Sequence, residues 1–299
     1  MQYLFTAKQA KQLDEHAIQE VGFPGTVLME KAATILSSVI SQSIRKDEGV
    51  LFVCGCGNNG GDAVAAARIL KQQGYHTAIV LVGETSRMSE DLFLQLRLAA
   101  ACDVEAVTAA EVDSAEYPIL VDGLFGVGLN RPVEGVYRAM IEQMNRSQKR
   151  IFAIDIPSGI HGDTGKVLGT AVKAETTVTF GVNKLGLVLY PGCRYAGNVV
   201  IGDIGYPACS YEAIENPAYY YDLKDLENCL PARKPDGHKG TFGHVLVIGG
   251  SKNMCGAAVF AAKAAYRMGA GLVKVLSASE NRQTILTMLP EALADTYEE

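Results

Sequence analysis

The stretch 50–74, VLFVCGCGNNGGDAVAAARILKQQG, constrains the fold more than any other part of the chain. Its first five residues are uniformly apolar, as expected of a strand that is covered on both faces. A glycine-rich loop follows, and Ala63 to Gly74 then has the composition of a helix. A buried strand that passes through such a loop into a helix is the first half of a βαβ unit, and it predicts a parallel sheet.

The same alternation continues to about residue 204. Two helices are expected before the first strand: one begins at a Thr6-x-x-Gln9 capping box and ends at Gly22, and the other covers 27–43. The pattern therefore predicts an α/β protein, a Rossmann-like three-layer αβα sandwich with a mostly parallel sheet. Further strands are expected at 77–82, 117–122, 150–156, 176–180, 186–189 and 199–204, further helices at 89–102 and 136–145, and Lys184 on a loop.

The loop 55–62, GCGNNGGD, contains the pattern G-x-G-x-x-G, whose backbone N–H groups can hold a phosphate at a helix N-terminus. One alternative is an ordinary strand-to-helix turn that only needs glycine. Another is a dinucleotide-binding loop, with Glu84 as the carboxylate that binds the ribose. The two asparagines and Asp62 disfavour that second reading, because a carboxylate repels a pyrophosphate and the amides add directed donors and acceptors. We expect the loop to hold a polar molecule, and its oxygen atoms also suit a cation.

Polar side chains follow three strands of the predicted sheet. Because right-handed crossovers bring the carboxyl ends of parallel strands to one edge, these side chains are expected to lie together. Each of them alone is explained by a turn, since Asp, Asn and Ser close turns readily. Their convergence favours a functional site. The residues are Asn58, Asn59, Asp62, Asp122, Asp155 and Ser158.

Composition excludes several classes of protein. The chain has 299 residues, 48% of them hydrophobic and 20% charged, which is typical of a globular protein with two domains. Its net charge of −6 provides no basic surface for nucleic acid. The N-terminus lacks the apolar core of a signal peptide, and no run approaches the roughly 20 apolar residues of a membrane span. We therefore expect a cytoplasmic protein with a small-molecule partner and no membrane partner.

The seven cysteines are scattered and odd in number, which indicates a reducing compartment. Cys54 and Cys56 are interpreted as a coincidence at a strand end, because a zinc site needs a fuller set of ligands. No two of the five histidines have the spacing of metal ligands.

The polar stretch 209–218 predicts a domain boundary, with a first domain over 1–210 and a second over 220–299. In the second domain we expect strands at 244–248 and 272–276 with a helix at 256–268 between them. A two-stranded sheet is marginal by itself, so this part is interpreted as the beginning of a larger domain. Its uncovered apolar faces are expected to make it poorly stable unless the first domain or a partner chain covers them.

Five motifs of the first domain resemble those of the YjeF family of nicotinamide nucleotide repair proteins. Residues 1 to about 205 are similar to its N-terminal NAD(P)HX epimerase domain. Residues from about 220 resemble the start of its ribokinase-like, ADP-dependent dehydratase domain, through HKGTFGHVLVIGG and GAAVFAAKAAYRMGAGLV. The epimerase motifs are Leu28-Met29-Glu30, GCGNNGGD, DGLFGVGL at 122–129, DIPSG at 155–159, and Phe180 with Lys184-Leu185-Gly186.

The resemblance implies a ligand set. Potassium would be bound by Asn59, Asp122 and Ser158, and Asp155 would be the catalytic acid/base. Ala63 departs from the family, many members of which have glycine there; its methyl group narrows the approach to the ligand but removes no functional group. The residues implied to hold the hydrated nucleotide are Asn58, Asn59, Gly60, Gly61, Asp62, Gly126, Val127, Gly128, Leu129, Asn130, Arg131, Pro132 and Asp155, with Ala257 in the second domain.

The implied reaction interconverts the R and S forms of NADHX and NADPHX, the hydrated forms of NADH and NADPH. Their C6 carries a hydroxyl next to a ring nitrogen, so inversion needs a C–O or C–N bond to open reversibly while a carboxylate shuttles one proton. For this task we expect the pKa of Asp155 to lie nearer neutrality than about 4, raised by burial or by Asp62 and Asp122.

A complete second domain is implied to be a dehydratase that uses ADP or ATP. The Gly-Asp-x-Gly loop on which that activity relies does not occur after residue 220, so these 299 residues are expected to be an epimerase without dehydratase activity. Two other functions are open: a non-catalytic nucleotide-binding or scaffold module of the same fold, and a nicotinamide-dependent dehydrogenase. The sequence leaves open the oligomeric state, a homo-oligomer included, and the preference between NADHX and NADPHX.

Overall fold

The computed structural model describes residues 2–229 and 232–297. The chain forms two compact units, the first ending at Asp225 and the second beginning at Leu226. This division lies later than the sequence predicts, because β10 (Ala218–Tyr220) pairs with β1 (Gln2–Phe5) and so belongs to the first unit.

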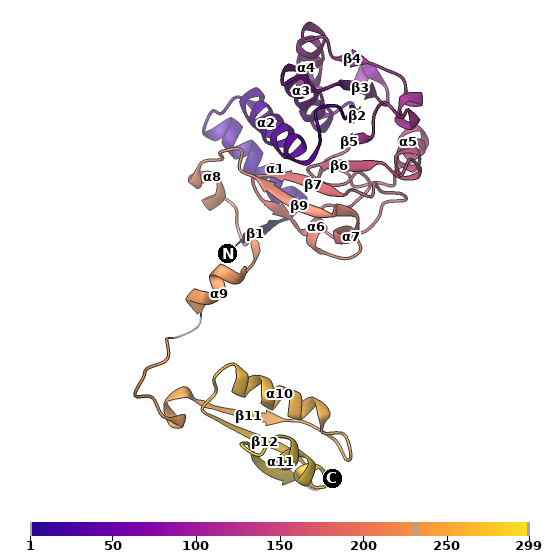
Figure 1. Ribbon diagram of the computed structural model, residues 1–299. Helices are drawn as coiled ribbons and strands as arrows, with labels where there is room; N and C mark the ends of the chain where they lie inside the picture. The colour runs from indigo at the N-terminus through magenta and orange to yellow at the C-terminus, as the bar shows by residue number, and fades with distance from the viewer. Residues whose placement is uncertain (1, 230–231, 298–299) are drawn as a thin grey trace. The chain divides into compact units, whose positions relative to one another are not determined.

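The first unit is built on a seven-stranded sheet in which every neighbouring pair is parallel (Figure 1). Its central strands consist of apolar residues that are buried on both faces, as the apolar runs predict. In spatial order the strands are β4 (Glu105–Ala106), β3 (Thr77–Leu81), β2 (Val50–Cys54), β5 (Ile119–Gly123), β6 (Arg150–Ile154), β7 (Thr176–Phe180) and β9 (Asn198–Gly202).

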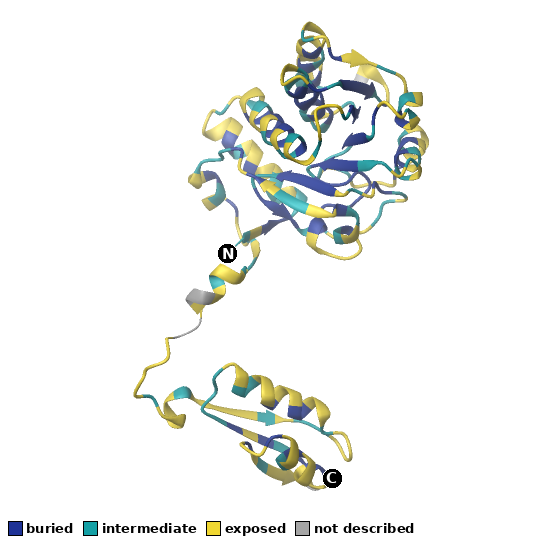
Figure 2. Ribbon diagram, viewed as in Figure 1, coloured by how far each residue is buried: buried dark blue, intermediate teal, exposed yellow. Residues whose placement is uncertain are grey.

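Helices cover both faces of this sheet, which confirms the predicted three-layer sandwich. On one face, α2 (Gly25–Ser43), α3 (Asn58–Gln72) and α4 (Glu90–Ala101) pack on Val50 and Phe52. On the other face, α5 (Gly135–Arg146) packs on the alternate residues of the same strand, Leu51 and Val53. Figure 2 shows the buried strands between these exposed helix surfaces.

The N-terminal segment departs from the prediction at its first element. The strand β1 precedes the expected helix and pairs in parallel with the two-residue strand β8 (Asn183–Lys184). Lys184 therefore lies in a strand and not on a loop as predicted. The helix α1 (Ala7–Glu15) begins at the predicted Thr6 capping box and continues as a π-helical turn over His16–Glu20.

Two further differences concern glycine. The helix α3 begins at Asn58 and not at Ala63, so most of the glycine loop is the first turn of a helix. The segment expected as a strand over 186–189 is a short helix, α6 (Leu185–Val188). Here Gly186 packs on the backbone of residues 161–162, and its N–H donates to the Gly162 carbonyl at 2.6 Å. A four-residue apolar run has no periodicity that separates these two structures. The short helices α7 (Gly192–Ala196) and α8 (Ala208–Glu212) complete the unit.

The second unit contains a three-stranded parallel sheet, one strand more than predicted. Its order is β11 (His244–Ile248), β12 (Leu272–Ala278) and β13 (Leu293–Tyr297), with α10 (Gly256–Arg267) and α11 (Arg282–Met288) as the connections. The helix α9 (Leu223–Cys229) lies at the division between the units. Among the described residues, no helix is long and apolar enough to cross a bilayer.

Candidate functional site

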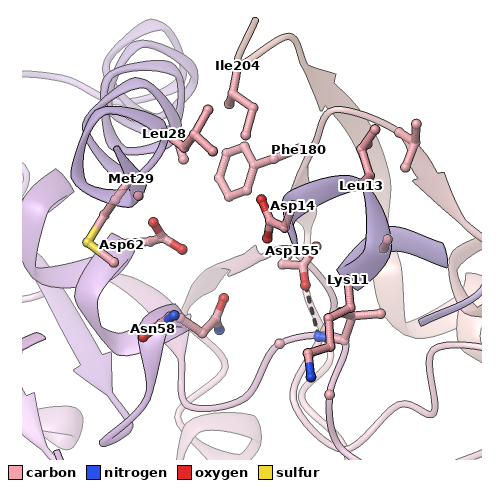
Figure 3. A pocket seen from close by; sticks show the side chains of 18 of the residues that line it. Lys11, Leu13, Asp14, Leu28, Met29, Asn58, Asp62, Asp155, Phe180 and Ile204 are labelled. Carbon is pink, nitrogen blue, oxygen red and sulfur yellow. Dashed lines mark hydrogen bonds between the residues drawn. The ribbon is translucent and has the colours of Figure 1, made fainter. Parts of the chain in front are cut away.

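A pocket of about 480 Å³ opens at the carboxyl ends of the strands in the first unit. Asp155, directly after β6, and the loop after β5 form its floor, the start of α3 forms one wall, and α1 and α2 form the others (Figure 3). Its apolar lining includes Leu28 and Phe180. A concave, largely apolar pocket with a few converging polar groups is typical of a small-molecule site.

Asp155 occupies a strained backbone position at the floor of this pocket. Its φ of +65° lies in the left-handed region, which non-glycine residues rarely adopt. The Ile156 N–H donates to the Ile154 carbonyl at 2.8 Å, so Asp155 is the central residue of a γ-turn. Strain of this kind persists only where the surrounding structure holds it, and it is common at functional sites.

The Asp155 carboxylate has three partners. The Lys184 Nζ lies 2.8 Å from Oδ1, the Thr179 hydroxyl donates to Oδ1 at 3.4 Å, and the Val127 N–H donates to Oδ2 at 2.9 Å. Burial alone raises the pKa of Asp155, but Lys184 and the two hydrogen bonds outweigh it and hold the pKa below its ordinary value. The expectation of a pKa nearer neutrality was wrong, because the buried Lys184 ammonium group lies beside the carboxylate.

Lys184 is the buried partner of Asp155, and the sequence predicted no role for it although it lies in the Lys184-Leu185-Gly186 motif. Its side chain is buried, and its Nζ also donates to the Thr179 hydroxyl at 2.7 Å and to the Phe180 carbonyl at 3.0 Å. The pairing of Lys184 with Phe5 in β1 fixes its place. The sequence contains one indication of this ion pair, since a lysine in an otherwise apolar segment needs a buried partner.

Gly126 allows the loop after β5 to approach Asp155. A Cβ at this position would lie 3.0 Å from the Asp155 Oδ2 and 3.4 Å from the Asn59 Oδ1. Glycine therefore lets the next peptide group donate its N–H to the carboxylate.

Asp62, on α3, is half-buried and lines the same pocket. It makes no hydrogen bond and no ion pair with any described residue. Burial, followed by the nearby carboxylates of Asp155, Asp14 and Asp91, raises the pKa of Asp62 well above its ordinary value. One pocket thus contains two carboxyl groups whose surroundings shift their pKa values in opposite directions.

Asp122 and Ser158 lie behind the pocket and tie together the loops after β5 and β6. The Ser158 hydroxyl and N–H donate to the two carboxylate oxygens at 2.6 and 2.8 Å, and the Leu124 N–H donates to Oδ1 at 3.2 Å. Burial raises the pKa of Asp122 to about 6, although these hydrogen bonds oppose it.

Asn59 has an unsatisfied amide. Its Nδ2 is buried and has no hydrogen-bond partner among the described residues. Because the oxygen and nitrogen of an Asn amide are interchangeable in assignment, an oxygen at that position would face a missing donor or cation. Asp122 and Ser158, which are predicted to bind the same cation, also carry hard oxygen atoms. Within residues 2–229 and 232–297, no group of three His, Cys, Asp or Glu side chains is arranged to hold a metal ion.

The pocket brings together about half of the residues predicted to bind the nucleotide. Gly60 and Gly61 lie behind the pocket wall: a Cβ at Gly60 would collide with the Gly55 carbonyl, and one at Gly61 would lie 2.8 Å from the Met29 Cε. Ala257 is exposed on α10 in the second unit. Those in the lining are Asn58, Asn59, Asp62, Gly126, Val127, Gly128 and Asp155; Leu129, Asn130, Arg131 and Pro132 continue the loop outside it.

The helix α1 supplies a wall that the sequence reasoning did not connect with the site. Lys11 and Asp14 line the pocket, and the Tyr206 hydroxyl donates a hydrogen bond to the Asp14 carboxylate. The capping box predicts where this helix begins, but no sequence pattern indicates that the helix lies against the pocket.

Comparison with known proteins identifies two sequence families in the chain. The family described as "YjeF-related protein N-terminus" matches residues 25–186, and "NAD(P)H-hydrate dehydratase" matches residues 245–299. The NAD(P)H-hydrate epimerase of Oenococcus oeni is 39% identical over 201 residues, which are 67% of this chain and 95% of that protein.

The bifunctional NAD(P)H-hydrate repair enzyme Nnr of Thermofilum pendens is 35% identical over 298 residues, which are 97% of this chain and 56% of that protein. The chain therefore spans about half the length of such bifunctional relatives. The crystal structure of yeast ynu0, YNL200c, superposes with a TM-score of 0.64 at 20% identity and covers 74% of this chain and 97% of that one. That likeness supports the fold.

Proposed function

Because the chain belongs to the YjeF family, we propose that its first unit is an NAD(P)H-hydrate epimerase, which interconverts the R and S forms of hydrated NADH and NADPH. The observation that carries this proposal is the strained Asp155, whose carboxylate is held by Lys184 at the floor of the pocket. The match to single-domain epimerases over nearly their whole length supports it.

Asp155 is the proton acceptor in this proposal. Its low pKa keeps the carboxylate ionised, and Lys184 and the Val127 N–H fix its orientation. An ionised carboxylate within hydrogen-bond reach of the C6 hydroxyl accepts the hydroxyl proton as the adjacent bond opens. Reclosure on the other face of C6 returns the proton and completes the inversion.

The rest of the nucleotide is assigned to the start of α3 and the loop 126–132. The backbone N–H groups at a helix N-terminus favour a phosphate. Arg131 is exposed on the loop and supplies a positive charge for the same group. This assignment keeps the family's ligand set and adds the wall formed by α1.

Potassium is the cation that we assign to Asn59, Asp122 and Ser158. The donor set and the unsatisfied Asn59 amide support it. When bound, such an ion would position the loops after β5 and β6 and neutralise phosphate charge.

Asp122→Ala tests this assignment. The variant is expected to lose the response of the epimerisation rate to potassium and to bind the nucleotide more weakly. A wild-type potassium response in this variant would place the ion elsewhere.

The second unit is proposed to be part of an NAD(P)H-hydrate dehydratase domain that uses ADP or ATP, with Ala257 as a nucleotide contact. The family match over residues 245–299 supports this.

We also propose that the protein works in a reducing compartment such as the cytoplasm. All seven cysteines are free thiols, which supports this proposal.

Asp155→Asn tests the proposed function. The variant keeps the shape of the side chain but cannot accept the proton, so the epimerisation rate is expected to fall by at least about 100-fold while the dissociation constant for NADPHX stays within about tenfold. Wild-type turnover by the variant would refute the assignment. Equal affinity of the wild type for NADPH and NADPHX would favour the dehydrogenase alternative instead.

A further inference from the structure

Asp62 and Asp155 point into one pocket from different elements, and their surroundings differ (Figure 3). Asp155 has a cation and two hydrogen-bond donors, whereas Asp62 has none among the described residues. A half-buried carboxylate without a partner is costly to ionise. A protonated carboxyl group bears no such cost and can donate its proton.

The charges around Asp62 favour the same state. The helix α2 faces the pocket with apolar side chains, among them Leu28 and Met29. Of the two lysines in the lining, Lys184 is bound to Asp155, and Lys11 is exposed and pairs with Glu15 at 3.3 Å. The ionisable groups that line the pocket with Asp62 are Lys11 and Asp14 from α1, Asp91 from α4, Asp155 after β6, Lys184 from β8, and Tyr206.

We propose that Asp62 is a second catalytic residue, which donates a proton to the reacting atoms while Asp155 accepts one. The inference rests on the proposed function and deepens it, because it assigns separate proton donor and acceptor groups to the same site. The opposite shifts of the two pKa values support it, since paired groups of this kind mark an acid and a base.

The protons balance for either bond that opens. If C6–N1 opens, the C6 hydroxyl gives its proton to Asp155, the freed oxygen pair forms the carbonyl, and the C6–N1 bonding pair moves to N1, which takes the proton of Asp62. Closure on the other face reverses each transfer, and both carboxyl groups return to their first state.

If C6–O opens, Asp62 protonates the hydroxyl, which leaves as water while the N1 electron pair forms the C6=N1 bond. A water molecule then adds to the opposite face of C6 and gives its proton to Asp155. The proton has moved from Asp62 to Asp155; before the next conversion in the same direction Asp155 releases its proton to solvent and Asp62 takes one up, whereas a conversion in the other direction returns it directly. Both routes need two groups in opposite protonation states.

Asp62→Asn tests this role with pure (S)-NADPHX as the probe. The variant is expected to fold, because Asp62 has no hydrogen bond to lose. Its kcat is expected to fall by about 100-fold or more, with the dissociation constant changed by less than about tenfold. Asp62→Glu, which restores an acid, is expected to recover part of the rate and gives a second variant should the first not fold.

The pH profile separates catalysis from structure. Wild-type kcat/KM is expected to fall at low pH as Asp155 is protonated and at high pH as Asp62 loses its proton. Asp62→Asn should lack the fall at high pH. Asp91→Asn is the matched control. It removes a nearby negative charge and so lowers the pKa of Asp62. The fall in kcat/KM at high pH should therefore move to lower pH in this variant but should not disappear.

The outcomes are distinguishable. If the wild type interconverts the epimers and Asp62→Asn keeps kcat within threefold, or keeps the fall at high pH, Asp62 is not the proton donor and the epimerase proposal stands. If the wild type itself does not interconvert them, both proposals fail.

Discussion

The charged side chains of Asp155 and Lys184 are buried together, so each compensates the charge of the other. Only 16% of the Asp155 side chain and 4% of the Lys184 side chain are exposed. Removal of one partner from such a pair leaves an uncompensated buried charge, which typically costs 3–5 kcal/mol. The same ion pair that keeps Asp155 ionised therefore stabilises the floor of the pocket.

Lys184→Met is expected to lower the free energy of unfolding by about 3 kcal/mol at pH 7. The folded-state pKa of Asp155 is depressed, so its contribution to stability is present above the unfolded pKa and is lost as pH falls through the folded pKa. In the variant, burial without Lys184 raises the pKa of Asp155, so the carboxyl group takes up a proton as pH falls and the uncompensated charge disappears. The difference between variant and wild type should thus be larger at pH 7 than at pH 4. Urea unfolding at both pH values measures it.

Lys11→Met is the control for that experiment, since Lys11 is exposed and its pair with Glu15 is a surface pair. It is expected to change the stability by less than about 1 kcal/mol. Equal losses in the two variants would contradict the special role of Lys184.

Gly126→Ala tests the close approach of the loop to Asp155. The added methyl group would lie 3.0 Å from Oδ2, so the carboxylate or the loop must shift by a few tenths of an ångström, and we expect the hydrogen bond from the Val127 N–H to lengthen. We expect the acid limb of the pH–rate profile to move to higher pH, because a lost hydrogen bond raises the pKa of Asp155. Gly57→Ala is the control, because a Cβ added at Gly57 would meet no atom within 4 Å. An unshifted acid limb in Gly126→Ala would count against this geometry.

Among individual residues, the sequence predicted which polar side chains lie at the pocket better than which of them contact each other. Asp62, Asn59 and Asp155 follow strands that converge at one edge, which topology alone predicts. The partnership of Asp155 with Lys184 depends on the pairing of β8 with β1 near the N-terminus. No local pattern contains such a long-range contact.

At the scale of elements, α1 links stability to the site. The Thr6 side chain accepts the Gln9 N–H at 3.1 Å, and the Asp163 carboxylate accepts the Ala7 N–H at 2.5 Å. These contacts fix the beginning of a helix that forms one wall of the pocket.

Thr6→Ala is expected to lower the free energy of unfolding by about 1 kcal/mol, because it removes the N-cap. The KM for the hydrated nucleotide should rise as α1 frays. Urea unfolding and steady-state kinetics measure the two effects. Thr34→Ala, on an exposed part of α2, should change the stability by less than about 0.5 kcal/mol. No difference between the two variants would contradict the importance of the cap.

The elements that the sequence predicted correctly have strong, long patterns, such as the apolar strand β2 and the capped helix α1. Those that it missed or misassigned are short: β1 with four residues and α6 with four. Their structure is set by pairing and close packing with distant residues. The early start of α3 has a local cause, because Gly60 packs on the backbone of Gly55.

At the scale of the whole molecule, the two units differ in how well they bury apolar surface. The first has cores on both faces of a seven-stranded sheet. In the second, Val245, Leu246 and Ile248 of β11 are 37%, 56% and 68% exposed. Exposed apolar residues along an edge strand favour association or unfolding.

A protein that ends at Asp225 is therefore expected to fold and to keep the epimerase rate of the full chain within about threefold, since domains with their own core fold independently. Residues 226–299 alone should unfold at lower urea concentration than the first unit. Circular dichroism and the epimerase assay measure both effects. Loss of activity on removal of the second unit would show that it contributes to the site.

The most direct measurement starts from one pure epimer. Purified protein is mixed with (S)-NADPHX, and the two epimers are followed by proton NMR against a protein-free sample and the Asp155→Asn variant. We predict that the wild type brings the mixture to its equilibrium composition far faster than either control. If the epimers change at the protein-free rate in all three samples, the first unit is not an epimerase.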